Sequence, residues 1–152
     1  MKRLYSILVS CTIMLMLSLA GCEGEKELIV IEGNLPIKTS TLYMVGDATP
    51  AGWDINNPTL LTASAEDALV FCYEGHLNTG EFKCCLSAGS WNNPFIRPMT
   101  QAREINKSGI EKEPFQLYAG GDDLKWKVTD AGNYRLVFDL RNWTLAVDYQ
   151  GE

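Results

Sequence analysis

Residues that commonly carry out catalysis are scarce in this chain. Its single histidine, His76, is expected in a polar loop between two strands, and no His or Cys residues have the spacing of a metal site. The sequence offers neither a nucleophile beside a base nor a marked pair of carboxylates. Asp122 and Asp123 could bind calcium through oxygen ligands, but a solvated turn is the simpler interpretation. We therefore predict a protein that is not an enzyme and has no metal and no cofactor.

Positive charge is also scarce. The chain has 13 Lys and Arg against 19 Asp and Glu, a formal net charge of −6. Lys2 and Arg3 lie in the first 21 residues, so the remainder has 11 cations against the same 19 acids, a net charge of −8. An acidic surface repels polyanions, which argues against nucleic acid as a partner.

No apolar run is as long as the ~20 residues that a membrane-spanning helix needs. The N-terminal run from residue 4 to 19 instead follows two cations and ends in Leu19-Ala20-Gly21-Cys22. This combination is typical of a lipoprotein signal peptide. We predict that residues 1–21 are removed and that Cys22 is acylated, since two or more acyl chains anchor a protein stably in a membrane.

Cysteine is sparse in the rest of the chain, where only Cys72, Cys84 and Cys85 remain after Cys22. An odd number in an oxidising compartment allows at most one bridge among them. We interpret the three as structural and leave open a bridge from Cys72 to Cys84 or to Cys85.

The 131 residues that follow the predicted signal suffice for one domain. Residues 22–39 are polar and acidic and predict a tether. From residue 40 to 152, apolar residues recur at every second position, and the segment 134–149 predicts a hairpin about a turn at 141–142. Glycine, proline and asparagine turns separate the further strand candidates, with one helical turn conceivable at 63–68. These candidates are 41–45, 69–73, 81–86, 95–97, 115–118 and 125–128. The pattern predicts an all-β fold, an immunoglobulin-like β-sandwich.

Two tryptophans lie between turn residues, where a loop and not a strand is expected. They are Trp53, in Pro50-Ala51-Gly52-Trp53-Asp54, and Trp91, in Gly89-Ser90-Trp91-Asn92-Asn93-Pro94. The apolar face of a sugar ring stacks on an indole, so loop indoles favour a glycan site. Packing over the edge of a core is the alternative for both. Trp126 and Trp143 fit strand-borne core positions, and we interpret them as structural.

Two cations are expected to lie near those indoles. If Phe82 and Cys84 face the core, alternation directs Lys83 to the opposite face of its strand. Arg97, in Phe95-Ile96-Arg97-Pro98, follows the same logic. Both could donate hydrogen bonds to sugar hydroxyls.

Several segments together resemble one binding domain of the SusE/SusF-type starch-binding outer-membrane lipoproteins. The most specific is Gly46-Asp47-Ala48-Thr49-Pro50-Ala51-Gly52-Trp53-Asp54, followed in order by Gly80-Glu81-Phe82-Lys83, Phe95-Ile96-Arg97-Pro98 and Lys125-Trp126-Lys127-Val128. The resemblance covers nearly all of residues 40–150.

That resemblance implies a non-catalytic lipoprotein at the cell surface, anchored by Cys22 in the outer membrane beside a TonB-dependent transporter complex. Its partner would be a polysaccharide, an α-glucan such as starch. By position, Trp53 and Trp91 match the aromatic residues of the family site, and Lys83 and Arg97 match its cations. Acidic residues after Cys22 fit export to the outer face.

The chain also departs from the family pattern. Relatives usually carry several binding domains, whereas one is expected here, and a lone site lacks the avidity of tandem sites. Cys84 occupies a position that is often phenylalanine, and some relatives bind other polysaccharides. The alternative function is therefore a structural accessory lipoprotein of the uptake complex, without sugar affinity of its own.

Overall fold

The computed structural model describes residues 37–118 and 120–152. The predicted signal peptide, Cys22 and residues 22–36 of the predicted tether lie outside these residues. Within the described part, every regular element is a β-strand, and the helical turn considered at 63–68 is absent. None of the described residues belongs to a helix that is long and apolar enough to cross a membrane.

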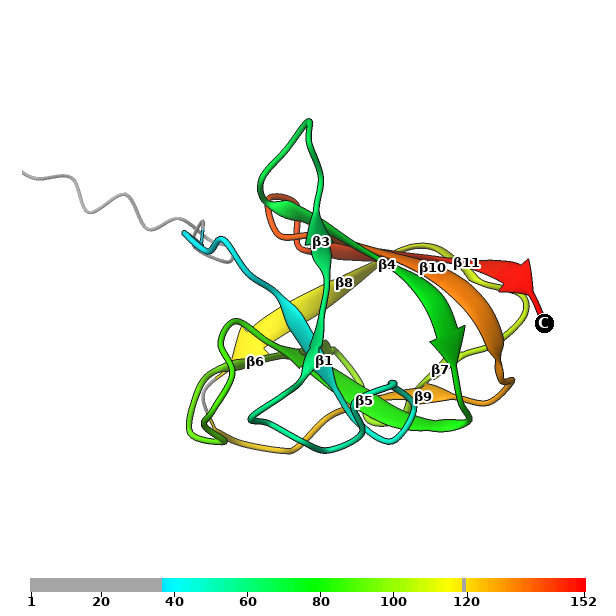
Figure 1. Cartoon of the computed structure of the whole chain (residues 1–152), viewed down its shortest axis with the longest axis horizontal. Coiled ribbons are helices and arrows are strands. Elements are labelled where there is room, and N and C mark those ends of the chain that lie inside the picture. The colour runs from blue at the N-terminus through cyan, green and yellow to red at the C-terminus, as the bar shows by residue number, and fades with distance from the viewer. Residues whose placement is uncertain (1–36, 119) are drawn as a thin grey trace, which may run out of the picture. The chain divides into compact units, whose positions relative to one another are not determined.

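Eleven strands make up the described part of the chain (Figure 1). They are β1 (Tyr43–Val45), β2 (Thr59–Leu60), β3 (Thr62–Ala63), β4 (Val70–Leu77), β5 (Gly80–Cys85), β6 (Phe95–Pro98), β7 (Arg103–Ile105), β8 (Ile110–Tyr118), β9 (Trp126–Val128), β10 (Gly132–Asp139) and β11 (Thr144–Gly151). The main path of paired strands is β2-β1-β5-β6-β8-β11-β10-β4-β3, and β9 pairs β5 and β7 off this path. All described pairs are antiparallel except β7 with β9.

The strands form two layers, and two segments of the chain take part in both. The first half of β8 pairs β11 and its second half, from Phe115, pairs β6. Only Leu61 separates β2, which pairs β1, from β3, which pairs β4. In Figure 1, β4, β10 and β11 form the upper layer and β5, β6 and β9 the lower one. The prediction of an all-β, immunoglobulin-like sandwich is confirmed, and the two connecting segments give it a barrel-like closure.

The main core follows the predicted alternation. Tyr134, Leu136 and Phe138 of β10 are buried together with Leu145 and Val147 of β11, which confirms the predicted hairpin. Trp126 and Trp143 are buried as predicted, but Trp143 lies in the turn before β11 and not on a strand. The Trp126 ring meets Phe138 edge-on at 5.6 Å between centroids. Its indole Nε1 donates a hydrogen bond of 3.2 Å to Glu113, so burial leaves no polar atom of Trp126 without a partner.

The structure corrects one expectation about an individual residue and decides one question that the sequence left open. His76 lies on β4, where it pairs with Asn133, because β4 continues to Leu77 and does not end before a loop. Cys72, Cys84 and Cys85 are all free, so the bridge that the sequence left open is not formed. Cys84 is in the main core and Cys85 faces the opposite side of β5, as expected for neighbours on a strand.

Candidate functional site

Strands β1, β5 and β6 have a second apolar cluster on the face that points away from the main core. It consists of Val45, Ile55, Cys85 and Phe95. Neighbouring strand residues such as Cys84 belong to the main core instead. Because side chains alternate between the two faces of a strand, Lys83 on β5 and Arg97 on β6 share the face of this second cluster. The cluster forms a floor for the residues described next.

The loop from residue 46 to 54 presents Trp53. Its backbone folds on itself, since the Gly46 amide donates to Gly52 O at 2.8 Å and the Thr49 hydroxyl donates to Gly46 O at 2.8 Å. The Asp47 carboxylate accepts a 2.7 Å hydrogen bond from the Glu81 amide of β5. These bonds fix the loop against the sheet and leave Trp53 39% exposed at its end.

Trp91 lies beside Trp53 on a second loop and is 47% exposed. The two ring centroids are 6.3 Å apart and the ring planes are inclined by 41°. Trp91 also stacks on Phe95, with centroids 5.8 Å apart and planes 20° apart. We refer to Trp53 and Trp91 as the aromatic pair. The structure therefore brings the two tryptophans that the sequence singled out into one exposed, angled surface.

Two lysines share one carboxylate next to the aromatic pair. Lys83 Nζ lies 2.6 Å from one oxygen of Asp123, and Lys125 Nζ lies 2.8 Å from the other. Lys83 is also 4.1 Å above the Phe95 ring centroid and 5.5 Å from that of Trp91, distances of cation–π contacts. Lys83 lies on the predicted face of β5, but it is only 8% exposed because these groups cover it.

The ionisation of Asp123 follows from this arrangement. Burial raises the pKa of its carboxyl, but hydrogen bonds from Lys125 and Lys83 outweigh burial, and the net pKa lies below the ordinary value. Asp123 is therefore an anion at neutral pH and keeps both ammonium groups beside the indoles.

Arg97 lies on the same face and is 7% exposed. Its Nη1 donates to the backbone oxygen of Asp122, and its guanidinium carbon is 4.6 Å from the ring centroid of Tyr118, which is exposed. Its Nε is buried and has no hydrogen-bond partner among the described residues. Arg97 is thus on the predicted face but is covered, whereas the sequence suggested an open surface.

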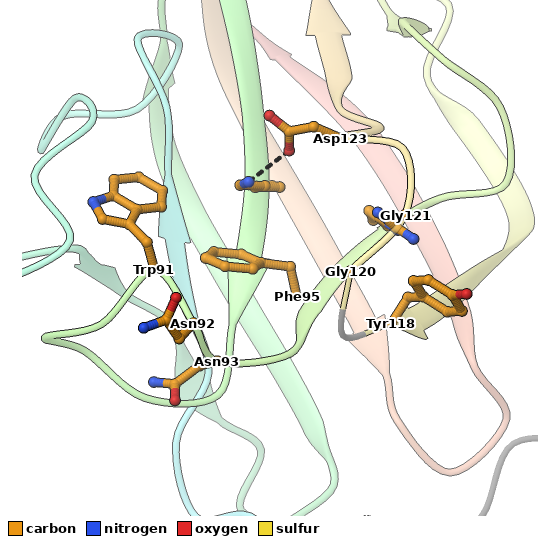
Figure 2. A pocket seen from close by; sticks show the side chains of 10 residues that line it. Trp91, Asn92, Asn93, Phe95, Tyr118, Gly120, Gly121 and Asp123 are labelled. Atoms are coloured by element: carbon orange, nitrogen blue, oxygen red, sulfur yellow. Dashed lines mark hydrogen bonds and ion pairs between the residues drawn. The ribbon is translucent and has the colours of Figure 1, made fainter.

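A half-open cavity of about 320 Å³ lies among these residues. Figure 2 shows Phe95 between Trp91 and Tyr118. Asp123, which also lines the cavity, accepts a 2.6 Å hydrogen bond from the Lys83 ammonium. Trp53 contributes from outside the cavity, through its contact with Trp91. The lining residues are aromatic, charged, amide-bearing or glycine: Lys83, Trp91, Asn92, Asn93, Phe95, Arg97, Tyr118, Gly120, Gly121 and Asp123.

The sequence did not identify several members of this site. Lys125 precedes the core residue Trp126, so strand alternation could have placed it on the outer face. Tyr118 ends β8 and had no local signal for binding. Asp123 was considered for calcium, but it pairs with two lysines, and the described residues contain no group of three or more His, Cys, Asp or Glu able to hold a metal.

A β-sandwich with an exposed aromatic pair beside hydrogen-bond donors has the features of a carbohydrate-binding module. Residues 41–146 match the family model described as "SusF/SusE starch specific CBMs". The chain belongs to this family, which confirms the resemblance found in its sequence.

The comparison with solved structures agrees in fold. The crystal structure of SusF from Bacteroides thetaiotaomicron matches with a TM-score of 0.57 and 18% sequence identity. The match covers 75% of this chain and 25% of that chain, so this chain matches about a quarter of the length of SusF. No match was found among curated protein sequences.

Proposed function

We propose that the chain is a non-catalytic lipoprotein of the cell surface that binds polysaccharide, an α-glucan such as starch, for an outer-membrane glycan uptake system. The observation that carries this proposal is the aromatic pair, since two large indoles stay exposed on loops that hydrogen bonds fix in place. In the loop of Trp91 these bonds run from the Asn93 side-chain amide to the Ser87 hydroxyl at 2.6 Å and from the Gly89 backbone amide to Ile55 O at 2.7 Å. Exposed aromatic rings of this kind offer stacking surfaces for sugar rings.

The inclination of the two rings favours an α-glucan. An α-1,4-linked glucan curves, so the faces of successive sugars are inclined, whereas a β-1,4-linked chain is flat and suits coplanar rings. The 41° between Trp53 and Trp91 fits the curved chain. The family description, which names starch, supports the same class.

The polar groups around the aromatic pair supply donors for the hydroxyl edges of the sugars. Lys83, Lys125 and Arg97 carry donors only, while Asn92 and Asn93 offer both a donor and an acceptor. In this proposal Trp53 and Trp91 stack on sugar rings, and Lys83 and Arg97 bind hydroxyl groups. Their burial preorganises them, because fewer side-chain rotamers are lost on binding.

We further propose that Cys22, after removal of residues 1–21, anchors the chain in outer-membrane lipid. Residues 22–39 would form a tether and residues 40–152 a binding domain. Radioactive palmitate labelling that disappears in Cys22→Ala tests the anchor, and protease treatment of intact cells tests surface exposure.

Titration calorimetry of the purified full chain against a panel of glycans tests the binding function. The panel comprises maltoheptaose, amylose, a β-1,4-glucan, a β-1,3-glucan and a mannan. We expect binding to the two α-glucans at least about tenfold tighter than to the others. If no glycan binds and the chain still co-purifies with a TonB-dependent transporter, the accessory role replaces glycan binding as the function.

A further inference from the structure

Arg97 differs from the other arginines of the described residues. Three exposed arginines each pair with a carboxylate: Arg103 with Glu113 at 2.6 Å, Arg135 with Glu74 at 2.9 Å, and Arg141 with Asp67 at 2.8 Å. Arg97 is more deeply buried than these three, and among the described residues it has no carboxylate within ion-pair distance. The chain has 19 Asp and Glu residues, so a shortage of acids does not explain why Arg97 lacks a carboxylate partner.

The bonds that Arg97 makes leave part of the guanidinium unsatisfied. Nη1 donates to the Asp122 carbonyl, and one face of the group covers the Tyr118 ring, but Nε is buried without a partner in the described part of the chain. A buried cation is costly unless an anion and further hydrogen bonds compensate it. A carbonyl oxygen and an aromatic face compensate only part of this cost.

The cavity beside Arg97 can receive a compensating group. Asp123 is already shared by Lys83 and Lys125. The charged residues that line the cavity are two cations, Lys83 and Arg97, and one anion, Asp123, so the lining has a formal excess of one positive charge. Gly121 has a φ of +68°, and a Cβ there would meet the Tyr118 ring at 2.8 Å and Arg97 Nη2 at 3.5 Å. Glycine at this position therefore keeps the wall of the cavity thin next to the guanidinium.

The cavity adjoins the aromatic pair, because Trp91 belongs to both (Figure 2). We propose that Arg97 binds an oxyanion substituent of the glycan, a carboxylate or a phosphate monoester, when a sugar ring stacks on Trp91. A guanidinium matches either group with two parallel hydrogen bonds. This inference rests on the proposed glycan-binding function and adds a charged subsite to it.

Binding of charged polymers and their neutral parents to the full chain tests the inference. One pair is amylopectin bearing phosphate monoesters and the same polymer after phosphatase treatment. The other is amylose oxidised at C6 to glucuronate and its unoxidised parent. We expect one charged polymer to bind at least about tenfold tighter than its neutral parent, and the pair that shows the preference identifies the oxyanion.

Two variants separate Arg97 from general charge effects. Arg97→Gln should reduce the ratio of charged to neutral affinity toward one, while the control Arg103→Gln, which removes an exposed arginine outside the cavity, should retain the preference. If the unaltered chain binds both charged polymers no more tightly than their neutral parents, the charged subsite is overturned and the proposed function still stands. This outcome does not depend on whether Arg97→Gln folds. A preference that persists in folded Arg97→Gln also overturns it. Failure of every polymer to bind overturns both proposals.

Discussion

At the scale of single residues, Asp123 holds two cations of the site in place. One carboxylate, on the loop between β8 and β9, bonds the ammonium groups of Lys83 and Lys125. Lys83 in turn lies against Phe95 and Trp91, and Lys125 lies 5.9 Å from the Trp53 ring centroid. The positions of both lysines relative to the indoles therefore depend on one ionised group.

Replacement of Asp123 by asparagine should lower stability in a pH-dependent way. The folded pKa of Asp123 lies below its ordinary value of 3.8, so its ionised form stabilises the fold above about pH 4, and this contribution is lost as the pH falls through the folded pKa. Because Asp123 is largely exposed, solvent screening limits the loss in Asp123→Asn to about 0.2–1 kcal/mol at pH 7. Urea unfolding from pH 7 to pH 3 measures it.

The control for this experiment is Glu111→Gln, which removes an exposed carboxylate on β8. Its unfolding free energy should stay within about 0.5 kcal/mol of the unaltered chain at each pH. A stability difference for Asp123→Asn that stays constant down to pH 3 would show that the charge of Asp123 is not its cause.

At the scale of elements, the loop from 46 to 54 explains why a string of small residues accompanies Trp53. Gly46 has a φ of +151°, and a Cβ on it would lie 2.1 Å from Glu81 O of β5. Ala48 and Thr49 of the same loop are buried, and the Ala48 amide donates to Glu81 O of β5 at 3.3 Å. Close approach of the loop to β5 thus requires small residues, and it fixes the chain that carries the indole.

Gly46→Ala should therefore destabilise the protein by about 2 kcal/mol or more, because it combines an unfavourable φ with a clash against backbone. Gly89→Ala is the matched control, since Gly89 also has a positive φ, +87°, but no atom lies within 4 Å of its would-be Cβ. It should cost about 1 kcal/mol. Thermal and urea unfolding compare the two variants, and equal losses would contradict a role for close packing at Gly46.

Strand alternation explains which strands could be predicted from the sequence and which could not. The hairpin of β10 and β11 was predicted because every second residue is apolar, and the same rule put Lys83 on the outer face of β5. By contrast, β2 and β3 have two residues each, too few for a period, and β7 was also missed. Turn residues marked the loops of Trp53 and Trp91.

The remaining parts of the site depend on contacts between segments distant in sequence. Lys83 and Asp123 are 40 residues apart, and Arg97 reaches Asp122 across 25. Neither segment alone has a pattern that specifies this contact. For the same reason the sequence suggested exposed cations, whereas the loop before β9 covers them in the fold.

At the scale of the whole molecule, the described residues form a closed β-sandwich that contains no disulfide. Its stability comes from a buried core that spans both layers, with aromatic residues such as Phe71, Phe115 and Phe138 fully or almost fully buried. Burial raises the pKa of Cys84 well above its usual value and that of Cys85 to about 11, although Lys83 partly lowers the latter. Both thiols are therefore protonated at neutral pH and shielded from solvent.

The melting temperature of the protein should consequently be the same, within error, with and without a thiol reductant. In the native protein at pH 8, iodoacetamide should label the partly exposed Cys72 before Cys84 and Cys85, because thiolate character and access control the rate. Peptide mass spectrometry measures the order. A melting temperature that falls on reduction would indicate a bridge, and faster labelling of Cys84 would contradict its burial.

The central claim is that Trp53 and Trp91 together bind an α-glucan. Calorimetric titration of the full chain with maltoheptaose tests this claim most directly. The titration compares the unaltered chain with Trp53→Ala, Trp91→Ala and a control, Met99→Ala. The control truncates an exposed apolar residue outside the cavity. Each tryptophan variant should bind at least about tenfold more weakly, since anchoring aromatic residues carry about 2 kcal/mol or more of binding energy, and Met99→Ala should bind normally. Unchanged affinity in both folded tryptophan variants would contradict the claim.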